Sequence, residues 1–144
     1  ILKFRTMTDE IAADGSTLPD QSRLTPLGEL LRSTSLDELP QLWNIVRGGM
    51  SLVGPRPFLM RYLPLYSEEQ SHRHDVRPGV TGWTAVTGRN DQSWAQKLES
   101  DVWYTRNVSL RLDLKILWRT LIVAARREGV SREGHVTGEE FTGA

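Results

Sequence analysis

The sequence TPLGELLRSTSLDELP, at residues 25–40, predicts a fold assembled from short helices. Thr25 can accept a hydrogen bond as a helix N-cap, and Pro26 suits the first helical position because its missing N–H would have no partner there. Leucines follow at helical spacing, and they form an apolar stripe. We expect this helix to end at about Thr34.

A second helix start follows directly along the chain. Ser35 and Glu38 have the spacing of a capping box. Pro40 would cost an intrahelical hydrogen bond in a helix that begins at Ser35, so a start near Asp37 fits the pattern equally well. Either start places the carboxylates of Asp37 and Glu38 at a helix N-terminus, where unpaired N–H groups keep an acid ionised. An ionised carboxylate can attack phosphorus.

The segment Pro55-Arg56-Pro57 supplies a guanidinium close behind these acids. Because prolines flank Arg56, its backbone is restricted and its side chain would lose little entropy on binding an anion. Attack on a phosphate needs countercharge, which Arg32, Arg56 and a divalent cation could supply together. Glu38 offers the hard oxygen that Mg²⁺ prefers. These residues favour phosphoryl transfer over passive binding.

The same residues also have ordinary structural explanations. Asp37 and Glu38 suit the first turn of a helix, where acids complement the helix dipole. Arg56 fits an exposed turn, and Arg32 fits the C-terminal end of a helix. Asp101 is expected to be a cap or a surface charge rather than a ligand. Residue types and spacing alone leave these alternatives open.

The rest of the chain predicts more helices and one weak strand. Ser67 and Gln70 have the spacing of a capping box, so we expect a helix to open there and to end before Pro78. We also expect a strand or hairpin over Val80–Val86, and helices over Ser93–Tyr104 and Leu110–Glu128. Residues 9–22 are polar and predict an exposed loop. The tail, residues 131–144, is expected to be loose or docked only by Phe141. The prediction is a single domain over residues 1–144, α+β and predominantly helical, with several short helices and a small β-hairpin or short strands.

The last predicted helix, over Leu110–Glu128, has two interpretations. Trp118 and aliphatic residues alternate with basic ones, as in a helix that lies at a lipid interface. Regular spacing of apolar residues favours instead a helix packed on the core, which we prefer. The residues of this apolar seam are Leu110, Leu114, Leu117, Leu121 and Ala124. No stretch reaches the roughly 18 uninterrupted apolar residues of a membrane-spanning helix.

Composition narrows the classes of function. The chain has 144 residues, of which 38% are hydrophobic, and these values fit one ordinary globular domain. Its formal net charge of +0 gives no general attraction to nucleic acid, so we expect no nucleic-acid partner. There is no cysteine, which excludes disulfides, a thiolate nucleophile and a zinc–thiolate site.

A series of motifs occurs in one order along nearly the whole chain. The motifs are KFRTM (3–7), RLT (23–25), LR (31–32), SLDELPQL (35–42), MSLVGPRP (50–57), YLPLY (62–66), RPGVTGW (77–83), GRN (88–90) and DVWY (101–104). Together they closely resemble the bacterial sugar transferase family, the monotopic polyprenol-phosphate phosphoglycosyl transferases. A chance match of so many ordered motifs is improbable.

This resemblance implies an enzyme that moves a sugar 1-phosphate from a UDP-sugar to polyprenol (undecaprenyl) phosphate and releases UMP, as the first membrane step of a surface-glycan pathway. It implies that Asp37 attacks the sugar-bearing phosphate and forms a covalent aspartyl-phosphosugar intermediate. Glu38, together with Asp37, would be associated with the required Mg²⁺. Five basic residues would hold phosphate or nucleotide groups or lie near them. They are Arg32, Arg56 and Arg89 at matching family positions, and Lys3 and Arg5 in a matching motif.

The chain also departs from the family pattern. Gly49 stands where an acid is usual, and residues 84–88 read TAVTG where AQVNG is common, which could alter nucleotide or sugar contacts. The N-terminal re-entrant membrane helix of the family does not precede Lys3, and we expect that upstream residues are missing. The resemblance places the full-length enzyme at the cytoplasmic face of the bacterial inner membrane. The closing residues, 134–143, resemble small members that act on N-acetylated amino sugars.

Two other functions stay open. In a Mg²⁺-dependent nucleotide-sugar hydrolase, water rather than a lipid phosphate would resolve the intermediate. A non-catalytic scaffold of glycan assembly would bind anions without turnover. The presence of Asp37, Glu38 and Arg56 counts against the scaffold.

Overall fold

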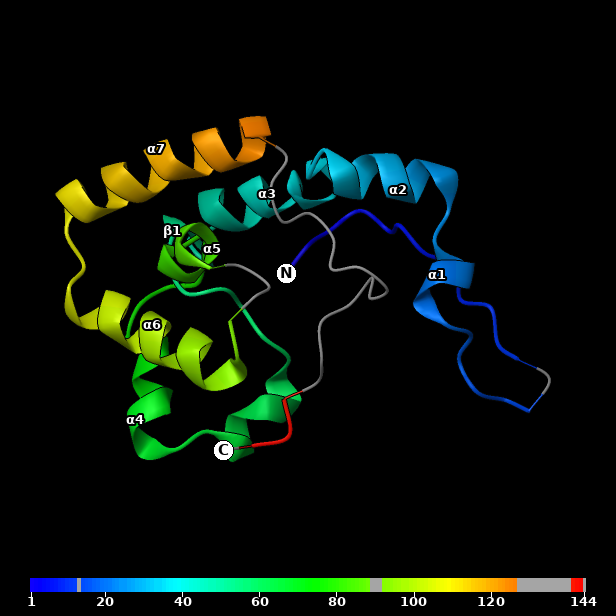
Figure 1. The fold of residues 1–144 in the computed structure, drawn as a ribbon, viewed down its shortest axis with the longest axis horizontal. Helices are drawn as coiled ribbons and strands as arrows, with labels where there is room; N and C mark the ends of the chain where they lie inside the picture. The colour runs from blue at the N-terminus through cyan, green and yellow to red at the C-terminus, as the bar shows by residue number, and fades with distance from the viewer. Residues whose placement is uncertain (13, 89–91, 127–140, 144) are drawn as a thin grey trace.

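Helices form most of the described part of the chain (Figure 1). The computed structural model describes residues 1–144 except 13, 89–91, 127–140 and 144. The α-helices are α1 (Asp20–Arg23), α2 (Pro26–Ser33), α3 (Gln41–Val46), α4 (Glu68–Ser71), α5 (Trp83–Thr87), α6 (Trp94–Arg106) and α7 (Leu110–Arg126). The 3₁₀ helices are η1 (Leu36–Glu38), η2 (Met60–Leu65) and η3 (His72–His74), and the strands are β1 (Ser51–Val53) and β2 (Gly79–Thr81). The predicted class, α+β and predominantly helical, is confirmed.

The strands β1 and β2 pair in parallel, with Ser51 opposite Gly79 and Val53 opposite Thr81. A parallel pair cannot be joined by a tight turn, so residues 54–78 cross over from the end of β1 to the start of β2. The predicted strand over Val80–Val86 is therefore confirmed only at its start, since β2 ends at Thr81, and the alternative of a hairpin is wrong. The segment after β2 turns into helix α5 instead of returning as a second strand.

Two glycines allow the chain to pass close to the end of β1. A Cβ atom added at Gly79 would lie 2.1 Å from the backbone nitrogen of Gly54, and one added at Gly82 would lie 2.2 Å from the carbonyl oxygen of Gly54. A side chain at either position would force the backbones apart. The chain that returns after the crossover, residues 54–78, can therefore pass directly beside the residue where the crossover begins, Gly54.

Helix starts follow the predicted caps at two places. The hydroxyl of Thr25 accepts a hydrogen bond of 2.9 Å from the backbone nitrogen of Gly28, and Pro26 begins α2 as expected. Ser67 and Gln70 form both hydrogen bonds of a capping box at the start of α4. These local signals are sufficient because both partners of each cap lie within one turn.

An arm, residues 8–23, stands away from the rest of the molecule at the right of Figure 1. Its two ends lie together, since Met7 and Leu24 form an antiparallel bridge and the nitrogen of Thr8 donates to the carbonyl of Arg23 at 2.9 Å. Most of the arm is exposed, as predicted, and helix α1 forms its last four residues, where the chain rejoins the rest of the molecule. The arm therefore leaves the fold and returns to nearly the same point.

Two clusters of buried residues form the centre of the core in the described part of the chain. One is formed by Val53, Tyr104 and Ile116 and the other by Tyr62, Leu98 and Phe141. The second is largely aromatic, and its rings meet edge to face, as Tyr62 and Phe141 do with centroids 5.7 Å apart. The predicted docking of Phe141 is confirmed, while residues 131–140 of the predicted loose tail lie outside the described residues.

Helix α7 buries a different face from the one predicted. Ile116 is fully buried, and Leu112 and Leu117 pack against its cluster. The exposed large apolar residues of the helix are Leu110, Leu114, Trp118 and Leu121, each more than half exposed. The predicted seam is wrong as a core face, because Leu117 is its one member that packs against the core. Its other leucines form an apolar stripe on the exposed face of α7. Among the described residues, no helix is both long and apolar enough to cross a bilayer.

Candidate active site

The two adjacent acids lie on a short 3₁₀ helix rather than at a capped α-helix. Ser35 has a left-handed backbone, with φ of 58°, and its side chain makes no cap. The predicted capping box at Ser35 and Glu38 is therefore wrong. Asp37 and Glu38 occupy η1, and Pro40 directly precedes α3, where its missing N–H removes no helical hydrogen bond. The left-handed residue reverses the chain after α2 and brings η1 against the N-terminal segment.

The N-terminal segment, residues 1–7, runs beside η1 and carries the first basic side chain of the site. The backbone nitrogen of Phe4 donates to the carbonyl oxygen of Asp37 at 3.0 Å. Further along, the nitrogen of Thr25 donates to the carbonyl of Thr6 at 3.2 Å. These bonds fix Lys3 next to the two acids, although it precedes Glu38 by 35 positions in the sequence.

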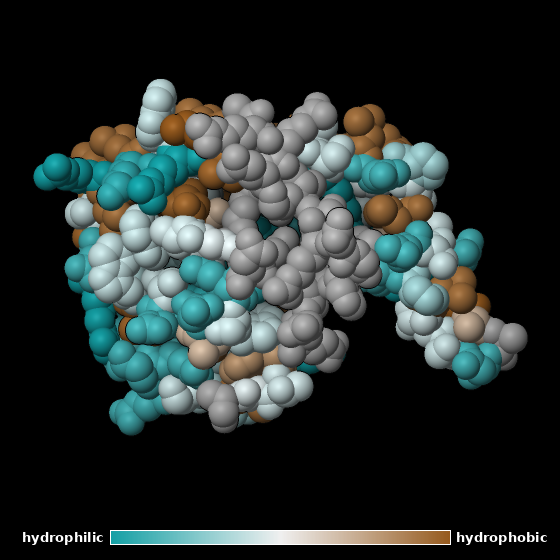
Figure 2. Space-filling model, viewed as in Figure 1, coloured by the Kyte–Doolittle hydropathy of each residue, from teal (hydrophilic) through white to brown (hydrophobic). Residues whose placement is uncertain are grey.

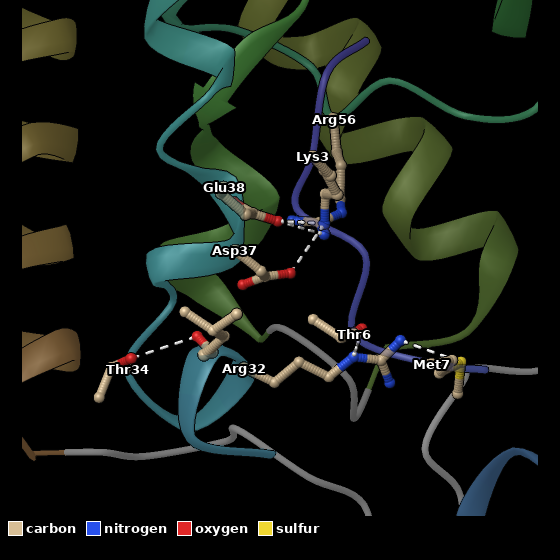
Figure 3. Close-up of polar contacts among 9 residues, drawn as sticks. Lys3, Thr6, Met7, Arg32, Thr34, Asp37, Glu38 and Arg56 are labelled. Carbon is tan, nitrogen blue, oxygen red and sulfur yellow. Dashed lines mark hydrogen bonds and ion pairs between the residues drawn. The ribbon is translucent and has the colours of Figure 1, made fainter. Parts of the chain in front are cut away.

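Glu38 accepts hydrogen bonds from two cations at one oxygen (Figure 3). Its Oε1 lies 2.7 Å from Nζ of Lys3 and 3.0 Å from Nη2 of Arg56. Burial raises the pKa of the Glu38 carboxyl, but the positive charges of Arg56 and Lys3 outweigh burial and hold that pKa below its usual range. Glu38 is thus ionised at neutral pH.

Asp37 is buried beside Glu38, Lys3 and Arg56, and its carboxylate makes fewer contacts than that of Glu38. The residue is 8% exposed, and its Oδ2 lies 3.7 Å from Nζ of Lys3, beyond hydrogen-bond distance. Within the described ranges, no other cation or hydrogen-bond donor is bound to its carboxylate. An anionic oxygen next to a cation, without a donor tying up its lone pairs, has the properties of a nucleophile toward an electrophilic phosphorus.

The structure brings together four of the predicted site residues and separates others from them. Lys3, Asp37, Glu38 and Arg56 form one cluster of two carboxylates and two cations. The guanidinium of Arg32 instead donates to the hydroxyl of Thr6 at 3.0 Å and approaches the sulfur of Met7. In Figure 3 it points along the N-terminal segment rather than toward the acids, so in this arrangement it holds the segment that carries Lys3.

The remaining two predicted basic residues are not part of this cluster. Arg5 forms an ion pair with Asp9 on the exposed surface at the start of the arm. Arg89 lies outside the described residues. No observation tests the expected contacts of Arg5 and Arg89 with phosphate or nucleotide groups, and these contacts stay predictions.

The acids fit a magnesium ion only as part of a larger coordination shell. Mg²⁺ prefers oxygen ligands and in phosphoryl-transfer sites takes one or two carboxylates plus substrate phosphates and water. Asp37 and Glu38 supply adjacent carboxylates of this kind, and Asp37 has lone pairs to spare. Among the described residues, no group of three or more acids or histidines could hold a metal ion by itself, so these two carboxylates would need further ligands, such as substrate phosphate and water.

Two buried residues behind the site were not identified from the sequence as functional. Arg73 and Asp101 form an ion pair with 2.7 Å between Nη2 and Oδ2. Burial raises the pKa of the Asp101 carboxyl, although Arg73 and the hydroxyl of Thr84 oppose this. The prediction that Asp101 is a cap or surface charge is wrong, because it lies on the inner face of α6. Its motif, DVWY, contains no signal that distinguishes a buried acid from a solvated one.

Comparison with known proteins identifies the family. A model of the family described as bacterial sugar transferase matches residues 1–127. The sugar transferase EpsL of Bacillus subtilis (strain 168) is 56% identical over the whole chain, which covers 71% of EpsL.

Two other relatives have names that state a reaction. Undecaprenyl-phosphate galactose phosphotransferase of Salmonella typhimurium is 43% identical over 78% of the chain, and UDP-glucose:undecaprenyl-phosphate glucose-1-phosphate transferase of Escherichia coli (strain K12) is 38% identical over 84%. The chain spans only 24% and 28% of these two proteins. With the match over residues 1–127, these identities show that the chain is a transferase and belongs to the bacterial sugar transferase family.

Proposed function

We propose that this chain is the catalytic part of a phosphoglycosyl transferase that moves a sugar 1-phosphate from a UDP-sugar to undecaprenyl phosphate and releases UMP. One observation carries the proposal: a buried carboxylate, Asp37, lies beside the cluster of Lys3, Glu38 and Arg56 without a hydrogen-bond donor of its own among the described residues. Relatives named as undecaprenyl-phosphate sugar transferases support the choice of donor and acceptor.

In the first proposed step, an oxygen of Asp37 attacks the sugar-bearing phosphorus of the donor. The new O–P bond forms as the bond to the nucleotide phosphate breaks, and UMP leaves. In the second step an oxygen of undecaprenyl phosphate attacks the same phosphorus, so that a lipid diphosphate sugar forms and the Asp37 carboxylate is restored. Splitting the transfer in this way needs only one nucleophile on the protein.

The cations of the site would stabilise the negative charge that passes through it. Lys3 and Arg56 balance the charges of Asp37 and Glu38, so a donor diphosphate adds negative charge that these four residues do not neutralise. A bound Mg²⁺ would supply this missing positive charge and orient the diphosphate oxygens. Glu38 keeps Lys3 and Arg56 in place, which reduces the reorganisation that the reaction requires.

We also propose that the apolar outer face rests on a membrane, where the lipid acceptor resides. In Figure 1 the helices α7 and α2 lie along the upper edge with α3 between and below them, and Figure 2 shows patches of apolar atoms over α7 and α2 with hydrophilic atoms between them. The large exposed residues of these helices are Leu27, Leu30, Leu42, Trp43, Val46, Leu110, Leu114, Trp118 and Leu121. So much exposed apolar surface fits a helix face in contact with lipid. UDP-sugars are cytoplasmic metabolites, which favours the cytoplasmic face of the bacterial inner membrane.

The test is to incubate the whole gene product with Mg²⁺ and a panel of UDP-sugars, including N-acetylated amino sugars, before any lipid acceptor is added. We expect an increase in protein mass equal to one sugar phosphate, located on the Asp37 peptide. Asp37→Asn should abolish the adduct and slow UMP release at least about 10³-fold. Asp75→Asn, which neutralises an exposed acid, is the matched control.

Each alternative function predicts a different result in this assay. Consumption of donor by a protein of unmodified mass would contradict the covalent intermediate. Continued UMP release that does not depend on added undecaprenyl phosphate would instead indicate the hydrolase. Absence of UMP release with every donor, with and without lipid acceptor, would indicate the scaffold.

A further inference from the structure

A buried ion pair lies behind the segment that carries Arg56. The side chains of Arg73, in η3, and Asp101, in α6, are only 1% and 3% exposed. Nη2 and Nε of Arg73 donate to Oδ2 of Asp101 at 2.7 and 3.1 Å. The other carboxylate oxygen accepts a hydrogen bond of 2.7 Å from the hydroxyl of Thr84, in α5. Three elements that are separate in sequence therefore meet at the Asp101 carboxylate, and these contacts compensate the burial of the ion pair.

The same guanidinium also binds the segment Pro55–Phe58. Nη2 of Arg73 donates to the backbone carbonyl oxygen of Arg56 at 2.5 Å. Its guanidinium carbon lies 4.3 Å from the centroid of the Phe58 ring, a cation–π contact. On the other side, the carbonyl of Pro55 accepts from the backbone nitrogen of Gly79 at 3.0 Å. The backbone on both sides of Arg56 is thus held by partners outside the segment.

Arg56 needs this support because its own side chain is not packed. The side chain is 56% exposed, and among the described contacts its side-chain partner is Glu38. A long side chain with so much solvent exposure gains little positional order from its surroundings. Apart from its ion pair with Glu38, its position depends on the backbone on which it stands, and Arg73 contacts that backbone directly.

We propose that Arg73 is a positioning residue which, anchored by Asp101, fixes the backbone of Arg56 so that the Arg56 guanidinium stays at Glu38 and at the donor phosphate. The link to the donor phosphate rests on the proposed function, whereas the link to Glu38 does not. Arginine suits this role because its fork can serve the Asp101 carboxylate and the Arg56 carbonyl at once. The single ammonium of a lysine can keep the charge pair but reproduces this geometry poorly.

The test is a double-mutant cycle between Arg73→Lys and Arg56→Ala, measured as kcat and KM for UMP release by the whole gene product. We expect Arg73→Lys alone to lower kcat/KM at least tenfold. In the Arg56→Ala background the same substitution should change kcat/KM by less than twofold, because there is no longer a side chain to position. Thr120→Val serves as the control, since it removes a hydrogen bond between α7 and β2 in which neither Arg73, Asp101 nor Arg56 takes part. All variants are assayed well below their unfolding midpoints.

Two results would overturn the proposal. One is an equal loss of kcat/KM from Arg73→Lys in both backgrounds, which would show a general structural effect. The other is a loss of the same size in Thr120→Val. If the parent protein releases no UMP from any donor, the proposed function has failed, and crystal structures of the variants then decide on positioning. The proposal requires that the contact between Arg56 and Glu38 is kept in the structure of Thr120→Val and lost in that of Arg73→Lys. If both variants keep this contact, the proposal is contradicted.

Discussion

The backbone nitrogen of Phe4 lies 3.0 Å from the carbonyl oxygen of Asp37, so the N-terminal segment is bound directly to the 3₁₀ helix that carries the proposed nucleophile. This bond places Lys3, the neighbour of Phe4, beside both acids. The ammonium is therefore held by the backbone as well as by its own ion pair. A cation fixed in this way contributes to transition-state stabilisation without further reorganisation.

Substitution of Lys3 tests its contribution. We expect Lys3→Met to lower kcat/KM for UMP release by about 10- to 100-fold, because one of the two cations that face developing charge is removed. The control is Arg106→Met, which removes a cation of an exposed ion pair with Glu69. Steady-state kinetics at neutral pH measure both. Equal rates in Lys3→Met and the parent would assign Lys3 a structural role only.

The ionised state of Glu38 predicts a pH dependence of stability. Its pKa is lower in the folded protein than in the unfolded chain, since Arg56 and Lys3 outweigh the effect of burial. Its stabilising contribution is thus present above the usual glutamate pKa of about 4.3 and is lost as the pH falls through the lower folded value. Denaturant unfolding of the parent and of Glu38→Gln should show a difference that shrinks on acidification. A constant difference from pH 7 to pH 3 would contradict the ion-pair geometry.

The orientation of α7 can be measured by paired substitutions. Ile116 is fully buried, so we expect Ile116→Ala to lower the free energy of unfolding by about 2–5 kcal/mol. Leu114 is more than half exposed, and Leu114→Ala should change the free energy of unfolding by less than about 0.5 kcal/mol. Urea unfolding in the absence of lipid gives both values. The opposite order would restore the predicted apolar seam as the core face.

The left-handed backbone of Ser35 predicts an unusual tolerance of glycine. A non-glycine residue in this conformation costs about 1 kcal/mol or more, whereas glycine adopts it freely. We expect Ser35→Gly to leave stability unchanged or to raise it by up to about 1 kcal/mol, and Ser35→Val to lower it by more than 1 kcal/mol. Thermal and urea unfolding compare the two. A clear loss of stability in Ser35→Gly would instead favour the capping role that the sequence suggested.

Local signals in the sequence predicted the local features of this fold well. The cap at Thr25 and the capping box at Ser67 were identified correctly because each depends on residues within one turn. The same type of signal failed at Ser35, since the spacing of a capping box does not specify φ. A left-handed residue was needed there to direct η1 toward the N-terminal segment, and this is a tertiary requirement.

Long-range features were predicted only in part. The importance of Asp37, Glu38 and Arg56 came from residue type, spacing and family resemblance, and the structure places them together with Lys3. The parallel pairing of β1 with β2 was missed because a three-residue strand carries almost no pattern of its own. The partnership of Arg73 with Asp101 was missed for a similar reason, as it joins residues 28 positions apart on different helices.

The arm closed by Met7 and Leu24 has a practical consequence for protein engineering. Because its two ends are already joined, extra residues at its tip lengthen a loop without separating the N-terminal segment from α2. Each doubling of such a loop costs only about 0.6 kcal/mol in closure entropy. An added Cβ at Gly15 meets no atom within 4 Å, so the tip has room. A fluorescent reporter or an affinity tag inserted beside Gly15 should leave catalytic turnover intact.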